Sequence, residues 1–170
     1  MKRVLTFIVA IFLLSGCASD TSQNQNEFSS QDAMFAEMMI PHHEQAIEMS
    51  NLALAKSKSD EILSLAKQIK EAQQPEIELM RTFIGENAGM HAGHTMMGML
   101  DESEMAELSA ATGEAFDQLF LKGMIEHHKG AIQMAEMVVG SANSTVSDLA
   151  KSIISTQTAE IDFMETLLKY

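Results

Sequence analysis

The sequence has few cysteine, aromatic and basic residues. Its 170 residues include one cysteine, no tryptophan and one tyrosine. A single cysteine excludes an internal disulfide and any site built from several thiolates. Basic residues are also scarce, because 11 Lys and Arg face 24 Asp and Glu, giving a formal net charge of −13. This charge makes nucleic acid and anionic membrane surfaces poor candidate partners and favours cations.

Long hydrophobic runs are also missing, and the longest one lies at the N-terminus. Residues 4–14 are apolar, follow two basic residues and are too short to span a bilayer comfortably. The run ends in Leu-Ser-Gly-Cys, which resembles the lipobox of bacterial lipoproteins. This predicts a signal peptide over 1–16 and lipidation at Cys17, in an exported protein of the periplasm or cell surface that contacts the membrane through its lipid only. The alternative is an ordinary signal peptide or an uncleaved anchor with an incidental cysteine.

Methionine is abundant, with 15 residues, and it accompanies a repeated histidine motif. Residues 39–49 (MIPHHEQAIEM) return 85 positions later as residues 124–134 (MIEHHKGAIQM). The segments that follow also repeat, because Gln73, Glu76 and Met80 correspond to Gln157, Glu160 and Met164. The chain therefore contains two copies of one structural unit.

Hydrophobic periodicity predicts an all-α protein. Spacing at 100° per residue places Phe35, Met39, His42, Ala46 and Met49 on one face, with His43 toward its edge. Long helices are expected over 31–56, 60–84, 114–139 and 146–168, with a short helix over 102–111.

Each copy is then a helical hairpin, and two amphipathic hairpins bury their faces most simply as a four-helix bundle over residues 31–170. Repeat one covers 31–84, a Met- and His-rich loop covers 85–101, and repeat two covers 102–170. Residues 17–30 are polar and are predicted to form a flexible tether.

The hairpins should bring polar residues together in the core. Residues equally far from a turn lie at the same height, which places His42 near Gln73 and Glu76. The second copy places His127 near Gln157 and Glu160. The predicted layer also includes His43, His128, Met39, Met80, Met124 and Met164. Buried carboxylates are costly alone, so these groups either satisfy one another and fix the helix register or hold a cation. Both interpretations stay open.

The loop between the repeats offers further soft ligands without the periodicity of a core segment. Its candidate ligands are Met90, His91, His94, Met96, Met97 and Met99. Imidazole suits copper and zinc, and thioether narrows the choice to Cu(I) or Ag(I). The alternative is a methionine-rich loop that covers the bundle end or docks a partner.

The paired histidines, with the Gln, Glu and Met of the second helices, resemble the family called domain of unknown function 305, from about Asp32 to the C-terminus. The resemblance implies a ferritin-like helical bundle. Its copper-binding, CopM-type members imply an exported protein that binds copper and supports copper tolerance.

We therefore expect a non-enzymatic protein that sequesters Cu(I), or silver, or passes it to a copper efflux or chaperone partner. One alternative is a ferritin-like di-metal oxidase, although the Glu-x-x-His motif of that chemistry does not occur in the sequence. The other is a methionine-rich protein-interaction module.

Overall fold

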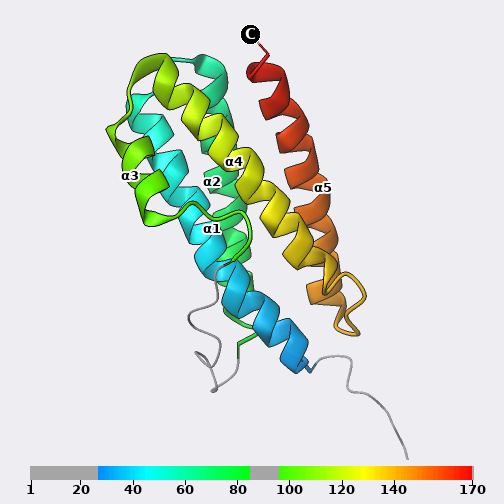
Figure 1. The fold of residues 1–170 in the computed structure, drawn as a ribbon. Coiled ribbons are helices and arrows are strands. Elements are labelled where there is room, and N and C mark those ends of the chain that lie inside the picture. The colour runs from blue at the N-terminus through cyan, green and yellow to red at the C-terminus, as the bar shows by residue number, and fades with distance from the viewer. Residues whose placement is uncertain (1–26, 85–95, 170) are drawn as a thin grey trace, which may run out of the picture.

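The described part of the chain is entirely helical. The computed structural model describes residues 27–84 and 96–169, which contain five α-helices and no strand. Two long hairpins are joined by a short helix (Figure 1). The first hairpin consists of α1 (Ser30–Lys56) and α2 (Asp60–Met80), the short helix is α3 (Glu102–Ala110), and the second hairpin consists of α4 (Gly113–Glu136) and α5 (Ser144–Leu167). The expected all-α class is confirmed.

Side chains at the helix starts explain where most helices begin. At α1, the Ser29 hydroxyl accepts a hydrogen bond from the Asp32 amide at 3.1 Å, and the Asp32 carboxylate accepts one from the Ser29 amide at 2.8 Å. This reciprocal capping box satisfies two amides that have no partner within the helix. Ser59, Asp101 and Asn143 cap α2, α3 and α5.

Two helices end earlier than their periodicity predicts. Helix α2 ends at Met80 instead of residue 84, because the amides of Thr82 and Phe83 bond to carbonyls three residues back and form a turn. Phe83 is nevertheless buried in the core, which explains why the apolar pattern continues past the helix. Phe28, in the predicted tether, packs on it with ring centroids 4.7 Å apart. Helix α4 similarly ends at Glu136 instead of residue 139.

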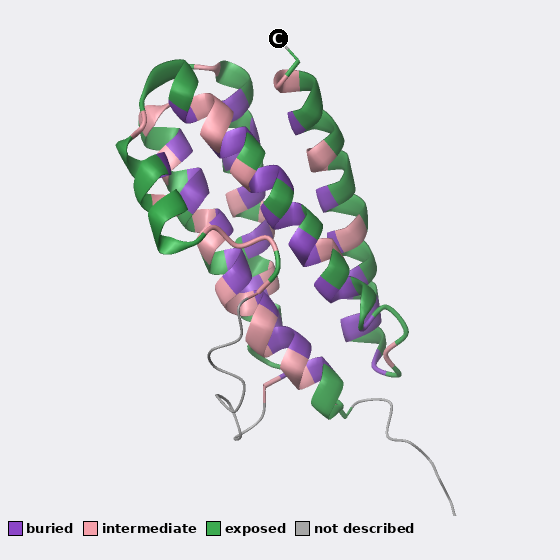
Figure 2. Cartoon of the chain, viewed as in Figure 1, coloured by how far each residue is buried: buried purple, intermediate pink, exposed green. Residues whose placement is uncertain are grey.

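Helix α1 has two long neighbours, α2 and α4, and α4 also packs against α5. Helices α1 and α4 run in opposite directions (Figure 1). Buried residues therefore lie along the facing sides of the long helices, whereas α3 buries only Leu108 (Figure 2). None of the helices in the described residues is both long and apolar enough to cross a membrane.

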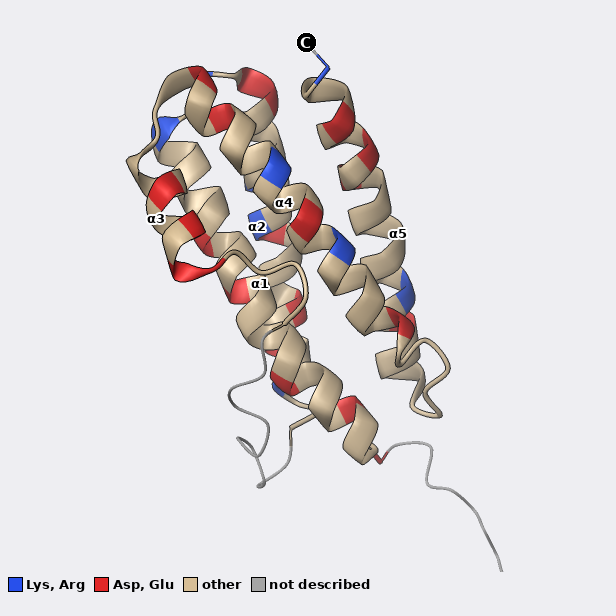
Figure 3. Ribbon diagram, viewed as in Figure 1, with Lys and Arg blue, Asp and Glu red and all other residues tan. Residues whose placement is uncertain are grey.

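The apolar core is divided into two clusters. One contains the first part of α1 and the last part of α2, for example Met39 and Met80, together with residues of α4 and α5. The other contains the opposite ends of the same four helices, for example Met124 and Met164. On every long helix, polar residues separate the two clusters along the sequence. Acidic residues occur along all the helices and outnumber basic ones (Figure 3).

Candidate metal-binding site

Eight polar residues separate the two apolar clusters, and we call them the polar layer. They are His42, His43, Gln73, Glu76, His127, His128, Gln157 and Glu160. The four histidines are 0% exposed and the two glutamines 2%. The side chains of Glu76 and Glu160 are 17% and 14% exposed, so their carboxylates lie at the edge of the layer. The structure therefore brings both copies of the motif into one region of the core.

The second histidine of each pair bonds to a glutamate of its own hairpin. His43 Nε2 lies 2.9 Å from Glu76 Oε2, and His128 Nε2 lies 2.7 Å from Glu160 Oε2. Equal distance from the turn places His42 near Gln73 and Glu76, but the hydrogen bond to Glu76 comes from the neighbouring His43. The sequence prediction assumed that α1 has one buried face. Because α1 has two neighbours, consecutive histidines about 100° apart are both buried, and His43 bonds to α2.

The first histidines of the two pairs meet at the contact between the repeats. The rings of His42 and His127 have centroids 3.7 Å apart and an interplanar angle of 39°. His42 Nε2 lies 3.1 Å from the carbonyl oxygen of Met97. Within the described residues, neither ring nitrogen of His127 has a hydrogen-bond partner.

Burial keeps both of these rings neutral at physiological pH. It lowers the pKa of His42 to about 3, although the bond to the Met97 carbonyl acts in the opposite direction. It also lowers the pKa of His127 well below the ordinary value, and the neighbouring histidines lower it further, although an interaction with the His42 backbone acts in the opposite direction. The neutral form of imidazole is the one that binds a metal, because one of its ring nitrogens has a free lone pair.

Three histidines of the layer share one bonding pattern. His42, His43 and His128 each place Nε2 against an oxygen, and the Nδ1 of each is buried with no partner in the described part of the chain. Metal-binding histidines commonly donate one ring N–H to a carboxylate or carbonyl and coordinate through the other nitrogen. Nε2 and Oε1 of Gln73 and Oε1 of Gln157 also have no hydrogen-bond partner among the described residues. Hydrogen bonding within the layer is thus incomplete, which fits a role beyond fixing helix register.

These donors do not form a compact site of their own. Within residues 27–84 and 96–169, no group of three or more His, Cys, Asp or Glu residues is arranged to hold a metal ion. A metal at the layer would therefore need one or two imidazoles together with other ligands, such as thioethers.

The methionines predicted as ligands divide into two groups. Met39, Met80, Met124 and Met164 are 0% exposed and pack in the two apolar clusters. Of the loop methionines, Met96 packs partly against the core, Met97 is 58% exposed and Met99 is partly exposed. The loop residues Met90, His91 and His94 lie outside the described residues, as does Cys17.

Residues 96–100, which we call the strap, cross α1 and α4 beside the polar layer. The Gln45 side chain donates to the Leu100 carbonyl at 2.8 Å and accepts from the Leu100 amide at 2.9 Å. Gly98 and Gly130 allow the strap to approach α4 closely. Sequence reasoning did not identify Gln45, Gly98 or Gly130. The sequence carries no specific signal for them, because 45 and 130 are one of four corresponding position pairs at which the two motif copies differ.

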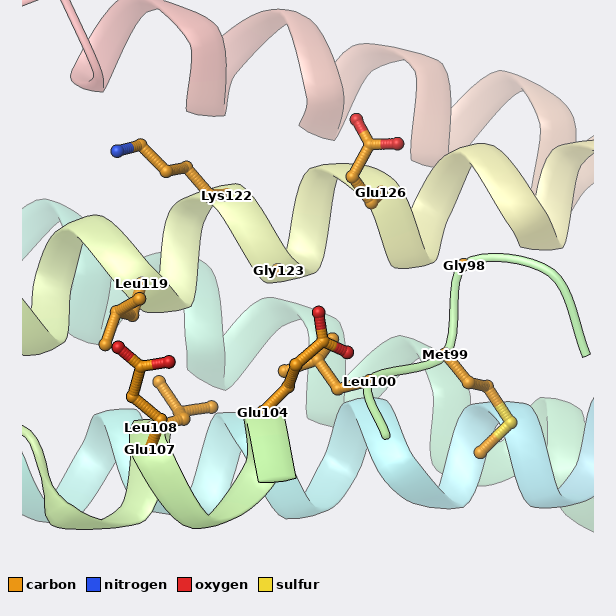
Figure 4. A pocket seen from close by; sticks show the side chains of 10 residues that line it. All are labelled: Gly98, Met99, Leu100, Glu104, Glu107, Leu108, Leu119, Lys122, Gly123 and Glu126. Carbon is orange, nitrogen blue, oxygen red and sulfur yellow. The ribbon is translucent and has the colours of Figure 1, made fainter. Parts of the chain in front are cut away.

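A pocket of about 300 Å³ lies between the strap, α3 and α4. In Figure 4, Glu104 and Glu107 extend from α3 and Met99 from the strap. The pocket therefore has an acidic wall with a thioether at its edge.

Two segments of the sequence match known families. Residues 1–18 match the lipid attachment site of prokaryotic membrane lipoproteins, so the chain carries the signal of an exported lipoprotein. Residues 32–168 match the family described as domain of unknown function (DUF305). A comparison with curated proteins found no match.

Several solved structures are similar to the chain over most of its length. A DUF305 fragment from Deinococcus radiodurans is 32% identical, with a TM-score of 0.76, over 84% of this chain and 98% of that one. A DUF305 protein from Streptomyces coelicolor is 29% identical, with a TM-score of 0.73, over 82% and 91% of the two chains. CopM in its Cu(I)-bound form is 31% identical, with a TM-score of 0.70, over 81% and 95%. CopM is also known in Cu(II)-bound and Ag-bound forms. The family match and these structures together establish that the chain belongs to the DUF305 family.

Proposed function

We propose that this protein is a non-enzymatic, copper-binding lipoprotein of the periplasm or cell surface. It sequesters Cu(I), with Ag(I) as a second cargo, and releases the ion to an efflux pump or chaperone. In this proposal the two hairpins act as a ferritin-like four-helix scaffold for the metal. Binding of copper and silver by CopM supports the choice of metal.

The observation that carries the proposal is the unsatisfied polar layer. Five ring nitrogens of its four histidines are buried without a partner in residues 27–84 and 96–169. Unpaired buried polar groups are costly, so a core selected for stability alone would contain few of them. Neutral imidazoles that have a free lone pair are instead useful as ligands.

The chemistry of the donors favours monovalent copper. Thioether and imidazole are ligands that Cu(I) accepts, and the exposed side chain of Met97 lies on the segment that bonds to His42. No thiolate is available, because the single cysteine lies in the lipid attachment segment. Sites without thiolate allow the ion to be passed on to a partner that binds it more tightly. The acidic surface adds a general attraction for cations.

A catalytic role is less consistent with the sequence. A ferritin-like di-metal oxidase needs a Glu-x-x-His motif on each of two helices, and the chain has none. We therefore propose binding and transfer of the ion without turnover.

Metal analysis and Cu(I) titration of the purified mature protein test this function. In competition with a chelator that reports free Cu(I), the protein is expected to withhold more than one equivalent of copper. A chelator that captures all the added Cu(I) at any protein concentration would contradict the proposal.

A further inference from the structure

Gln45 holds the strap on α1 by bonding to both polar groups of one peptide residue. Its side chain pairs with the carbonyl and the amide of Leu100 at 2.8 and 2.9 Å. Two such bonds fix the direction of the backbone at Leu100 as well as its position. The strap is therefore anchored one turn after His42, on the same helix.

Helix α4 accommodates the strap through glycine. A Cβ atom at Gly130 would lie 1.9 Å from the Met97 carbonyl oxygen, which is too close for any side chain. At Gly98, φ is +82° and a Cβ atom would lie 2.3 Å from the Glu126 carbonyl oxygen. Position 130 needs glycine because there is no space for a Cβ atom. Position 98 needs it for the same reason and because of its positive φ.

The two residues that hold the strap occupy a position at which the two repeats differ. Gln45 and Gly130 occupy the same position of the repeated motif, 85 residues apart. One copy supplies the amide that anchors the strap, and the other supplies the space for its backbone. The strap thus brings the Met97 carbonyl to His42, whereas both ring nitrogens of the corresponding His127 have no partner among the described residues.

The Met97 carbonyl determines which nitrogen of His42 carries the proton. A carbonyl oxygen only accepts hydrogen bonds, so His42 Nε2 must be the donor at 3.1 Å. In the neutral ring the lone pair then lies on Nδ1, which is buried and has no partner in the part of the chain that the structure describes. Glu76 and Glu160 select the same tautomer at His43 and His128, but each does so from its own hairpin.

We propose that Gln45 is a positioning residue for the metal layer, and that it acts through the strap. By anchoring Leu100 it holds the Met97 carbonyl on His42, which fixes the Nε2–H tautomer and leaves Nδ1 as the donor for Cu(I). This role rests on the proposed function, because it assigns Gln45 a part in copper binding.

Two variants test the role, with a matched control. Gln45→Ala removes the anchor, and Gly130→Ala displaces the strap from α4. Gln31→Ala is the control, because Gln31 also donates to a distant backbone carbonyl, that of Met137 at 2.8 Å, but at the end of the α4 helix. Circular dichroism confirms that each variant is folded.

The first readout is the tautomer of His42 in the metal-free protein, measured from ¹⁵N chemical shifts of the imidazole ring. The wild type and Gln31→Ala are expected to give one tautomer with Nε2 protonated, and the two strap variants a mixture. The second readout is Cu(I) affinity by chelator competition. Loss of a group that orients a ligand typically weakens metal affinity about 10-fold to 100-fold. We expect a loss of Cu(I) affinity in this range for Gln45→Ala and Gly130→Ala, and none for Gln31→Ala.

The two readouts separate the proposals. A single, unchanged His42 tautomer in both strap variants would overturn the positioning role. An altered tautomer with wild-type Cu(I) affinity would also overturn it, because the strap would then orient a ring that copper does not use. If the wild-type protein binds no Cu(I), the proposed function fails, whereas the tautomer comparison is still made in the metal-free protein.

Discussion

The rings of His42 and His127 lie against each other, 3.7 Å apart between centroids, at corresponding positions of two repeats. Their contact joins the two hairpins at a buried, polar point between α1 and α4. Each ring belongs to a pair whose other member bonds to a glutamate. The layer therefore combines two histidines that have a carboxylate partner with two that have none, and this difference can be tested.

His127→Leu is expected to leave the metal-free protein as stable as the wild type or more stable. The buried His127 ring has two nitrogens without a partner in the described residues, and leucine replaces it with an apolar group of similar size. Copper capacity should fall in the same variant. Urea unfolding in the presence of a chelator, together with Cu(I) titration, measures both effects.

His128→Leu is the control for that variant. His128 is equally buried, but its loss leaves the Glu160 carboxylate without its partner at 2.7 Å. We expect a loss of about 1–3 kcal/mol in the free energy of unfolding. Equal stability losses in both variants would show that His127 is also a structural residue.

Stability of the metal-free protein should decrease as the pH falls below about 6.5. The pKa of His42 is lowered by burial from 6.5 to about 3, and that of His127 is lowered too. Between the folded and unfolded pKa values, the unfolded chain binds more protons than the folded protein. The stability that the neutral rings contribute is therefore fully present above the unfolded pKa and is lost as the pH falls to the folded pKa. The slope should approach about 1.4 kcal/mol per pH unit for each ring.

Urea unfolding between pH 7 and pH 4.5 measures this slope. Carboxylates contribute in the same range, so the comparison is between the wild type and His127→Leu. The variant should lose the part of the slope that belongs to one ring. Identical slopes would mean that the pKa of His127 is the same in the folded and unfolded protein.

Gly130→Ala should destabilise the protein even though alanine favours helix formation. The added Cβ atom would lie 1.9 Å from the Met97 carbonyl oxygen, so the strap must move. We expect a cost of about 1–3 kcal/mol, as for other overpacked sites. Gly140→Ala is the control, because a Cβ atom there has no neighbour within 4 Å in the described residues. Thermal unfolding of the two variants should differ clearly, and equal melting temperatures would contradict the close approach of strap and helix.

Replacing the loop ligands should lower Cu(I) stoichiometry without unfolding the protein. The exchanged residues are Met90, His91, His94, Met96, Met97 and Met99. Met97 is 58% exposed, so its replacement by leucine removes a thioether at little structural cost. Met137→Leu is a control at an exposed methionine away from the strap, 43% exposed. Unchanged copper capacity in the loop variant would remove the loop from the mechanism.

The local sequence pattern was sufficient to predict the helices and to show that the polar residues of the layer face the core. The repeated motif and the 3.6-residue period predicted four long helices, and the periodicity placed His42, Gln73 and Gln157 on buried faces, where the structure has them. Apolar periodicity could not locate the end of α2, because Phe83 is buried from a turn instead of a helix.

The sequence by itself determined the helical class, the duplication and the concentration of imidazole and thioether groups, because these depend on residue types and their spacing. Only the tertiary structure decided which groups meet. Helix α1 lies between α2 and α4, so His43 bonds to Glu76 and His42 packs on His127. The strap reaches His42 because Gln45 and Gly130 differ at corresponding positions of the two copies. Such contacts depend on how helices rotate and pack against one another, which the periodicity of a single helix does not specify.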